Sequence, residues 1–529
     1  MHISIIILPI LLGFSVLNGS AFAEASDSRP NILLIVADDL GYADLGIFGS
    51  EIRTPNIDAL AREGLRFSQF HTAPLCAPTR AMLMSGNNNH VAGMARQHPF
   101  PPVKGQMAGY EEHLSDRIAP LPRVLSEAGY HTYTAGKWHL GEDVQHSARA
   151  AGFEKSFGVA EGAASHFDGR GFENAPTVYH EDGELAEWPD GAYSTDYYTD
   201  TLIGYIDANL GDGKPFFAYA AYTSPHWPLQ VPESELDRYA GAYDAGYDHL
   251  REVNFENLKA AKIIPPDSVL PPRNPDIPLW TSLSDEEKRR SARAMELYAA
   301  MVENLDHNIG RLLAYLRENR LDDNTLVIFM SDNGADGLDF YNRGPFVDYI
   351  RAHYDNRWEN MGGPDSFVSY DAPWAEAGSA PFRLYKGYAT QGGIVAPMIA
   401  AGAGVTMKDE IRHCFATVMD IAPTIIEMAG ARYPDDGSVQ AMRGSSLVPL
   451  LGGQTNQAHA DDEVTVLFQR NQAYVRQGNW KLTSIERPFD EAHFGLYDLS
   501  ADPGETTDLS ETHPEKRAEM IELWRSERR

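Results

Sequence analysis

Four short apolar runs along the chain are each followed at once by polar or charged residues. Continuous apolar runs are typical of strands that are buried on both faces, so they predict an α/β fold with a large, mostly parallel sheet between helices. Ligands bind beyond the carboxyl ends of such strands. We therefore expect one edge of the sheet to collect the polar clusters, which follow residues 32–36 (Asp38, Asp39), 130–134 (Lys137, His139), 216–219 (Pro225, His226) and 326–330 (Asp332, Asn333).

Helical spacing of apolar residues occurs between these runs. It predicts short helices over residues 57–64 and 120–128, and a long one over 297–316 whose apolar stripe packs into the core. Residues 232–290 are polar and rich in proline, which predicts a long surface excursion instead of a core element. Residues 334–375 are rich in Gly, Tyr, Trp and Asp and predict a loop that shapes a pocket.

The pattern changes after about residue 435. Short strand-like runs at 464–468, 473–476, 480–484 and 495–498 precede a helix over 514–525. This order is typical of a small α+β domain with an antiparallel sheet. The predicted organisation is a catalytic domain over residues 30–435 and a C-terminal domain over residues 436–529.

The N-terminus is typical of an export signal over residues 1–23. Residues 3–17 are almost entirely apolar, and Ala21-Phe22-Ala23 offers a small-x-small cleavage site. No Lys or Arg precedes the apolar run, so a retained anchor is the alternative. The run is short for a membrane span. We therefore expect processing by the export machinery, a bacterial periplasmic location and no stable membrane span.

The formal net charge is −31, from 44 basic and 75 acidic residues. Such a chain repels nucleic-acid phosphates, which argues against a nucleic-acid partner, and its acidity is typical of a solvated surface. An anionic substrate would need a local group of cations. The two cysteines, Cys76 and Cys414, could pair in an oxidising compartment, but they cannot make a four-thiolate zinc site.

Two acidic motifs follow strands of the predicted sheet. Asp38 and Asp39 follow one strand, and Asp332 and Asn333 follow another. Three carboxylates and an amide oxygen form a hard, oxygen-rich set that suits calcium, magnesium or manganese better than zinc. Either pair alone could instead cap a loop or a helix.

The run Cys76-Ala77-Pro78-Thr79-Arg80 predicts a helix start, because proline is tolerated in the first turn. Negative charge at position 76 would then lie beside the helix N-terminus and beside Arg80, four residues on. The alternative is a structural buried cysteine.

Four further residues could supply positive charge or move protons at the same edge. Each is ordinary by itself, but together they offer the local charge that an anionic ester requires. They are Lys137, His139, His226 and Lys386.

These motifs together resemble the signatures of the formylglycine-dependent sulfatases, in particular bacterial arylsulfatases of the alkaline phosphatase superfamily. The Cys-x-Pro-x-Arg core is intact in Cys76-Ala77-Pro78-Thr79-Arg80, and Gly136-Lys137-Trp138-His139-Leu140-Gly141 resembles the second signature. Pro225-His226, Ser331-Asp332-Asn333-Gly334 and Tyr385-Lys386 follow in the expected order. The resemblance covers the chain from about residue 29 to the C-terminus.

The resemblance implies an alkaline phosphatase-like fold and a sulfuric ester hydrolase that acts on a sulfate ester. A maturation enzyme would convert Cys76 to formylglycine, whose hydrate is the nucleophile. One calcium ion, with magnesium or manganese less favoured, would be held by Asp38, Asp39, Asp332, Asn333 and an oxygen of residue 76.

The resemblance also implies roles for the cations. Arg80 and Lys137 would support the hydrated aldehyde, and His139 would take a proton from it. His226 and Lys386 would face the leaving oxygen.

Two other functions remain open on the sequence. A phosphate or phosphonate monoester hydrolase could use the same scaffold, since tetrahedral phosphoryl and sulfuryl groups are alike. A non-catalytic exported protein that binds sulfated glycans is the alternative of another class.

Overall fold

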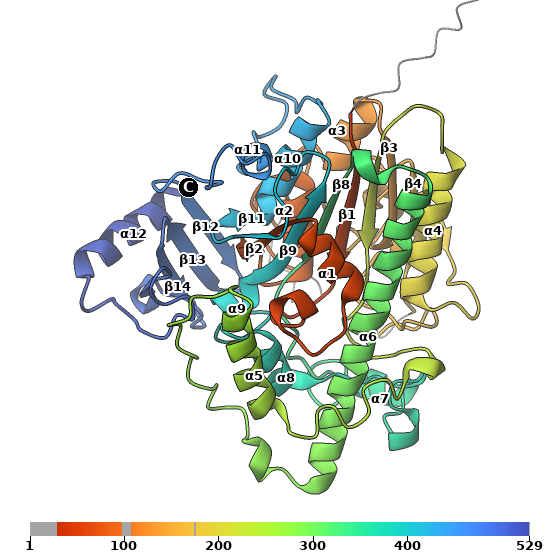
Figure 1. Ribbon diagram of the computed structural model, residues 1–529. Helices are drawn as coiled ribbons and strands as arrows, with labels where there is room; N and C mark the ends of the chain where they lie inside the picture. Colours follow the sequence, from red (N-terminus) through yellow and green to blue (C-terminus); the bar gives the residue numbers. More distant parts are fainter. Residues whose placement is uncertain (1–28, 98–106, 174–175, 528–529) are drawn as a thin grey trace, which may run out of the picture.

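The computed structural model describes residues 29–97, 107–173 and 176–527. The predicted export signal, residues 1–23, lies outside the described residues. Within them, one large sheet of eleven strands forms the centre of the molecule (Figure 1). Its strands are β1 (Asn31–Ala37), β2 (Gly64–His71), β3 (His131–Lys137), β4 (Lys155–Val159), β5 (Tyr179–Glu181), β6 (Glu184–Ala186), β7 (Phe216–Ala221), β8 (Thr325–Ser331), β9 (Val395–Gly402), β10 (Glu410–Arg412) and β11 (Ala416–Thr417).

The four strands predicted from the apolar runs are neighbours in this sheet. The order is β10-β2-β9-β8-β1-β7-β3-β4-β5-β6, with β11 also paired to β2. β8, β1, β7, β3 and β4 are parallel, whereas β9, β5 and β6 run antiparallel to their neighbours. The mostly parallel sheet is confirmed, and the carboxyl ends of its central strands lie at one edge.

Helices cover both faces of the large sheet (Figure 1). One face carries α1 (Pro55–Arg62), α4 (Ser194–Ala208) and α6 (Asp285–Glu318). The other carries α2 (Cys76–Ser85), α3 (Leu121–Glu127), α10 (Ile421–Met428) and α11 (Val448–Leu451). Further helices beyond the site edge and beside it are α5 (Tyr247–Ala260), α7 (Val347–His353), α8 (Asp371–Gly378) and α9 (Gln391–Ile394).

Helix α6 is longer than the apolar stripe suggested. It begins at Asp285, one residue after Ser284, whose side chain forms a capping box with Glu287. Its buried stripe includes Leu297 and Leu305, and full burial of a leucine contributes about 1.5–3 kcal/mol. No helix in the described parts of the chain is both long and apolar enough to cross a membrane.

The prediction that residues 232–290 form only a surface excursion is wrong in part. They contain α5, which buries Leu250, Phe255 and Leu258 and packs against α8. Trp280 from the same segment packs edge-on against Trp374. The flanking prolines and charged residues hid a helix whose apolar face is narrow.

The predicted C-terminal sheet is confirmed and lies beside β2 and β9 (Figure 1). Its antiparallel strands are β12 (Val464–Gln469), β13 (Gln472–Gln477), β14 (Trp480–Ser484) and β15 (Gly495–Asp498), covered by α12 (Pro514–Glu527). Met520 and Trp524 of α12 pack on this sheet in a hydrophobic cluster of its own. The exact domain boundary at residues 435 and 436 stays a prediction.

The C-terminal sheet also holds a loop of the larger unit. Gln472 donates a hydrogen bond to the carbonyl of Gly387 (2.9 Å) and accepts one from the N–H of Ala389 (2.8 Å). Lys481 donates to the carbonyl of Ala389 (3.0 Å) and pairs with Glu505 (2.6 Å). This loop directly follows Lys386, so the small sheet helps to place a predicted site residue.

Gly136 lies where strands β3 and β7 approach closely, and it has a φ of 120°. A Cβ there would lie 1.8 Å from the carbonyl oxygen of Ala221. We expect Gly136→Ala to reduce the free energy of unfolding by at least about 2 kcal/mol, because strand backbone must move. Differential scanning calorimetry and urea unfolding measure this loss.

The matched control is Gly204→Ala on the exposed side of α4, where nothing lies within 4 Å of the added carbon. It should leave stability unchanged or raise it by about 0.5–1 kcal/mol. Equal stability of the two variants would contradict the close approach at Gly136.

Candidate active site

The polar clusters after β1, β3, β7 and β8 meet at the carboxyl edge of the large sheet, as the sequence predicted. Hydrogen bonds and ion pairs tie residues from different strands to one another there. The side chains are almost completely buried: Asp38, Asp39, Arg80, Lys137, His139, His226, Asp332, Asn333 and Lys386. Because burial weakens solvent screening, the charges in this cluster act strongly on one another.

Cys76 begins helix α2 and points to the carboxylates after β1. Its Sγ lies 3.5 Å from Oδ1 of Asp38 and 3.7 Å from Oδ1 of Asp39. Burial, followed by the charge of Asp332, raises the pKa of the thiol well above its ordinary value. The unmodified side chain is therefore a neutral thiol at physiological pH, and not a thiolate nucleophile.

Two cations neutralise carboxylates that lie beside Cys76. Lys137 Nζ lies 2.9 and 2.7 Å from the two carboxylate oxygens of Asp38. Arg80 donates to Oδ2 of Asp332 through Nε at 2.9 Å, and its Nη2 is also 2.9 Å from that oxygen. Arg80 and Lys137 thus contact carboxylates directly, which places their charge around residue 76.

The pKa values of Asp38 and Asp332 are shifted in opposite directions. Burial, opposed by Lys137 and assisted by Asp332 and Asp39, raises the pKa of Asp38 to about 7. Burial also acts on Asp332, but Arg80 and Lys137 outweigh it and lower the pKa of Asp332 below its ordinary value. Asp332 is therefore the more firmly ionised of the two.

Lys386 lies between two carboxylates, one of which the sequence did not single out. Its Nζ is 2.7 Å from Oδ2 of Asp39 and 2.9 Å from Oδ2 of Asp336. Trp227 Nε1 donates to the same Asp336 oxygen at 2.8 Å. Despite burial, Asp336 and Asp39 hold the pKa of Lys386 well above its ordinary value. The sequence motifs did not identify Asp336, because it lies two residues beyond the recognised Ser331–Gly334 motif.

The two histidines of the cluster are neutral. Burial, then Lys386 and Lys137, lower the pKa of His226 well below its ordinary value, and burial with Lys137 and Arg80 does the same for His139. Nδ1 of His139 has no hydrogen-bond partner among the described residues. A cavity of about 470 Å³ opens beside His139 and is also lined by Glu112 and Glu142.

The donor atoms around Cys76 fit a divalent cation. Oxygens of Asp38 and Asp39, the Cys76 sulfur and a His226 nitrogen all lie within 4.8 Å of one another. His226 donates from Nδ1 to the carbonyl of Trp227 (2.7 Å), because a carbonyl only accepts. Its unprotonated Nε2 then faces Oδ2 of Asp39 at 3.2 Å, and Lys386 supplies positive charge beside that oxygen.

Asn333 and Asp332 border the same space. The amide nitrogen of Asn333 donates to Oδ1 of Asp39, and its buried Oδ1 has no partner within the described residues. Oδ1 of Asp332 accepts the N–H of Asp39 at 3.2 Å. An unpartnered buried oxygen among carboxylates is what a hard cation would satisfy.

All sequence-predicted site residues meet in this cluster, and the two cysteines do not meet. Cys76 is a buried free cysteine in the site, and Cys414 is a half-buried free cysteine elsewhere. The disulfide that the sequence left open is therefore not present.

A model of the sulfatase family matches residues 30–431, most of the chain. The chain belongs to the sulfatase family. It is 40% identical over 525 residues to an uncharacterised sulfatase of Schizosaccharomyces pombe, covering 95% of this chain and 94% of that protein. It is 38% identical to an arylsulfatase of Klebsiella aerogenes, covering 78% of this chain and 89% of that one.

Solved structures share the sulfatase fold. The structure of Ps i-CgsB in complex with k-i-k-neocarrahexaose has a TM-score of 0.68 at 23% identity and covers 94% of this chain and 92% of that chain. A structure in complex with D-glucosamine-2-N,6-O-disulfate has a TM-score of 0.61 at 20% identity, covering 94% and 97%. Each of these alignments includes 94% of this chain, so the fold as a whole is shared with sulfatase structures.

Removal of the Asp332 carboxylate should empty the cation site. We expect Asp332→Ala to weaken calcium binding at least about 100-fold, because it removes a carboxylate that borders the donor atoms and takes the nearest charge partner from Arg80. Isothermal titration of chelator-treated protein with calcium chloride measures the affinity. Asp348→Ala, an exposed carboxylate on α7, is the control and should bind calcium as the unmodified chain does. Unchanged calcium affinity of Asp332→Ala would remove Asp332 from the site.

Proposed function

We propose that this sulfatase is of the arylsulfatase type and releases inorganic sulfate with a formylglycine made from Cys76. The position of Cys76 carries this proposal: it lies at the start of α2, beside Asp38 and Asp39, with Arg80 and Lys137 holding charge nearby. A neutral thiol at that position is a poor nucleophile, which supports conversion of the residue. The arylsulfatase type is supported by the similarity to the Klebsiella aerogenes protein.

Two groups would complete the site. Asp38, Asp39, Asp332, Asn333 and the side chain of residue 76 would hold one calcium ion, with magnesium or manganese fitting an oxygen-rich set less specifically. When present, the cation would supply electrostatic activation of the sulfate. The hydrated aldehyde would supply the attacking hydroxyl and a second hydroxyl beside it.

The residues on the nucleophile side would arrange charge and accept a proton. Arg80 keeps Asp332 ionised, so that Asp332 can accept the proton of the attacking hydroxyl. His139 is neutral and has a free Nδ1, which suits it to take the proton of the second hydroxyl as sulfate departs. Lys137 neutralises Asp38 and reduces its repulsion of an anionic ester.

The residues on the opposite side would stabilise the leaving oxygen. Lys386 retains its charge between Asp39 and Asp336 and would supply the positive charge. His226 is neutral and lies 3.2 Å from Asp39 and 4.0 Å from Asp336, so it would face the leaving oxygen without adding charge. Preorganised positive charge lowers the barrier most where negative charge develops. Asp336 touches Lys386 and Trp227, so it acts as a positioning residue.

The maturation enzyme and the export machinery are the partners that this proposal requires. The apolar run over residues 3–17 supports export, and we propose a periplasmic location on that basis. The sulfate ester itself is the small-molecule partner.

A comparison of two esters tests the proposed function. We expect turnover of 4-nitrophenyl sulfate to exceed that of 4-nitrophenyl phosphate by at least about 100-fold in kcat/KM, because a single cation and a singly charged sulfate match in charge. Peptide mass spectrometry of residue 76 is the control and should show an aldehyde in place of the thiol. Faster phosphate turnover would favour the phosphatase alternative. Natively matured protein with an unmodified Cys76 and no turnover would favour the glycan-binding alternative.

Substitution of Lys386 should act selectively on poor leaving groups. We expect Lys386→Ala to reduce kcat/KM for phenyl sulfate at least about tenfold more than for 4-nitrophenyl sulfate, since a more basic leaving oxygen needs more stabilisation. Asp336→Asn should show the same selectivity more weakly, because Lys386 keeps its charge but loses one anchor. Lys214→Ala, an exposed lysine, is the control. Equal losses for both esters would argue against contact of Lys386 with the leaving oxygen.

A further inference from the structure

A second cavity lies between the large sheet and the C-terminal sheet. Its volume is about 670 Å³, and its walls come from β2, from the segment after α5, from His413 and from the turn between β13 and β14. None of the residues around Cys76 lines it. Cavities of this size at the junction of two units are common ligand sites.

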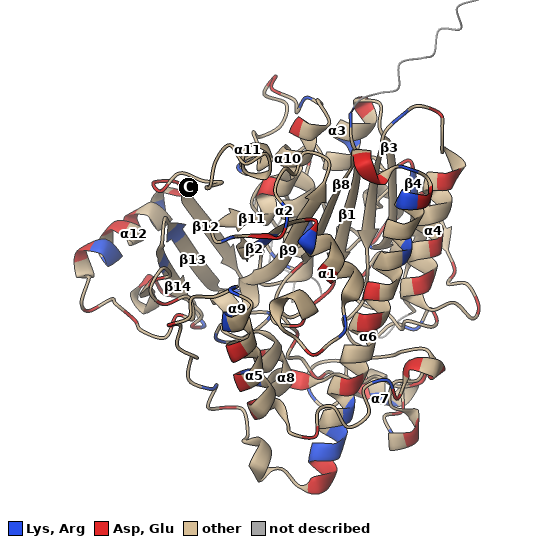
Figure 2. Cartoon of the chain, viewed as in Figure 1, with Lys and Arg blue, Asp and Glu red and all other residues tan. Residues whose placement is uncertain are grey.

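The charge of this cavity is opposite to that of the protein. The chain carries a net charge of −31, and acidic residues are spread over α4, α5 and α6 (Figure 2). Within the described residues, however, the cavity is lined by Lys259, Lys262 and Arg476 and by no Asp or Glu. Local positive charge in a concave, partly enclosed site attracts anions although the whole protein is acidic.

Arg476 at the inner end has no charge partner. The residue is 5% exposed, and no carboxylate of the described chain pairs with it. Its Nε donates to the carbonyl of Gly478 (3.0 Å) and its Nη1 to Nε2 of His71 (3.1 Å), while Nη2 has no hydrogen bond there. Burial lowers the pKa of Arg476 to about 10, so the guanidinium stays charged at neutral pH. The Phe415 ring, whose centroid is 4.2 Å from Cζ of Arg476, offsets part of the cost of burying this guanidinium, but it supplies no negative charge. An anion would compensate the rest.

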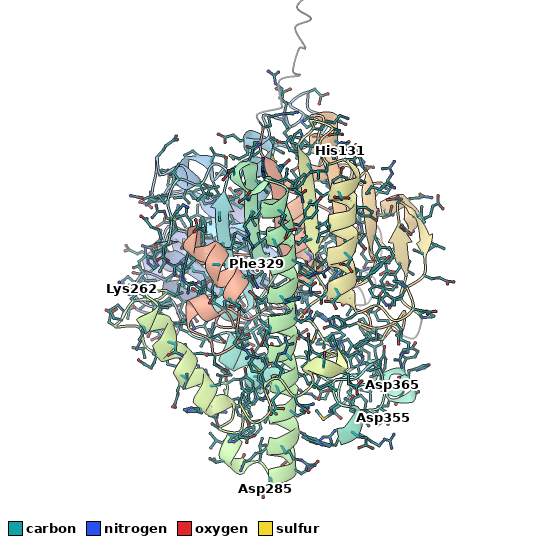
Figure 3. All side chains as sticks on the ribbon, turned by 45° about the vertical axis from the view of Figure 1, so that its right-hand side comes forward. His131, Lys262, Asp285, Phe329, Asp355 and Asp365 are labelled. Atoms are coloured by element: carbon teal, nitrogen blue, oxygen red, sulfur yellow. The ribbon has the colours of Figure 1, made fainter. Side chains whose placement is uncertain are left out.

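The outer end of the cavity adds exposed positive charge. Lys262 is exposed just beyond the end of α5 (Figure 3), and its ammonium has no ion pair in the described parts of the chain. Lys259 lies 3.3 Å from Glu256, the distance of a weak surface pair. Ile263 and Ile264 supply buried apolar wall between the two charged ends.

We propose that this cavity binds an organic anion, namely a sulfate or sulfonate head group on an apolar body. The head group pairs with the guanidinium of Arg476, which offers planar N–H donors to anionic oxygens. The apolar body packs on Ile263 and Ile264, and Lys262 adds long-range attraction. The site is separate from the one around Cys76, so its occupancy does not require hydrolysis.

Isothermal titration of the full, matured protein with sodium naphthalene-2-sulfonate tests the proposal. We expect binding separate from the active site, and we expect Lys262→Glu to weaken it about tenfold by charge reversal. Arg476→Gln should weaken it at least as much. Lys214→Glu, an equal charge change at an exposed position away from the cavity, should leave it within about twofold. The uncharged naphthalene-2-sulfonamide should bind at least about tenfold more weakly than the sulfonate.

Turnover of 4-nitrophenyl sulfate should be unchanged in Lys262→Glu, which shows that the variant folds. The proposal is overturned if Lys262→Glu and Arg476→Gln both bind the sulfonate as the unmodified chain does. It is also overturned if the sulfonamide binds equally well, or if the only binding observed has the same affinity as competitive inhibition at the active site.

Discussion

Buried charge at the carboxyl edge of the large sheet is the constraint on which the rest of the structure depends. Asp38, Asp39, Asp332 and Asp336 are buried beside Arg80, Lys137 and Lys386. Isolated charges would be expelled from such an interior, but each carboxylate here contacts a cation or a hydrogen-bond donor. Carboxylates still outnumber the cations, and burial, assisted by the charges of Asp332 and Asp39, raises the pKa of Asp38. A bound divalent cation would offset this excess of negative charge.

The fold stabilises this cluster by fixing the backbone of the strands that carry its residues. Parallel strands β8, β1 and β7 deliver Asp332, Asp38 and His226 from three buried segments, and packed helices prevent the strands from moving apart. The small C-terminal sheet also fixes backbone near the cluster, although it lies farther from it. Gln472 accepts a hydrogen bond from the N–H of Ala389 and Lys481 donates one to its carbonyl, so the second unit helps to hold the loop after Lys386.

The two positively charged regions of the molecule differ in how their charge is balanced. Around Cys76, every cation has a carboxylate within 3 Å. In the cavity at the junction of the two sheets, Arg476 has none among the described residues. The paired charges around Cys76 hold the site side chains in fixed positions. The guanidinium of Arg476 remains available to pair with an anionic ligand.

Sequence patterns predicted much of this structure because they are local. Apolar runs identified β1, β3, β7 and β8, the alternating C-terminal segments identified β12–β15, and short motifs named the residues that meet around Cys76. Three features depended on the tertiary structure. Asp336 joins the site only because the chain folds back to Lys386, and α5 becomes a core helix only because α8 offers it a surface. Arg476 has no ion pair because no Asp or Glu of the described residues lines its cavity. Local patterns encode strands and motifs, whereas contacts between distant segments decide which charges are paired.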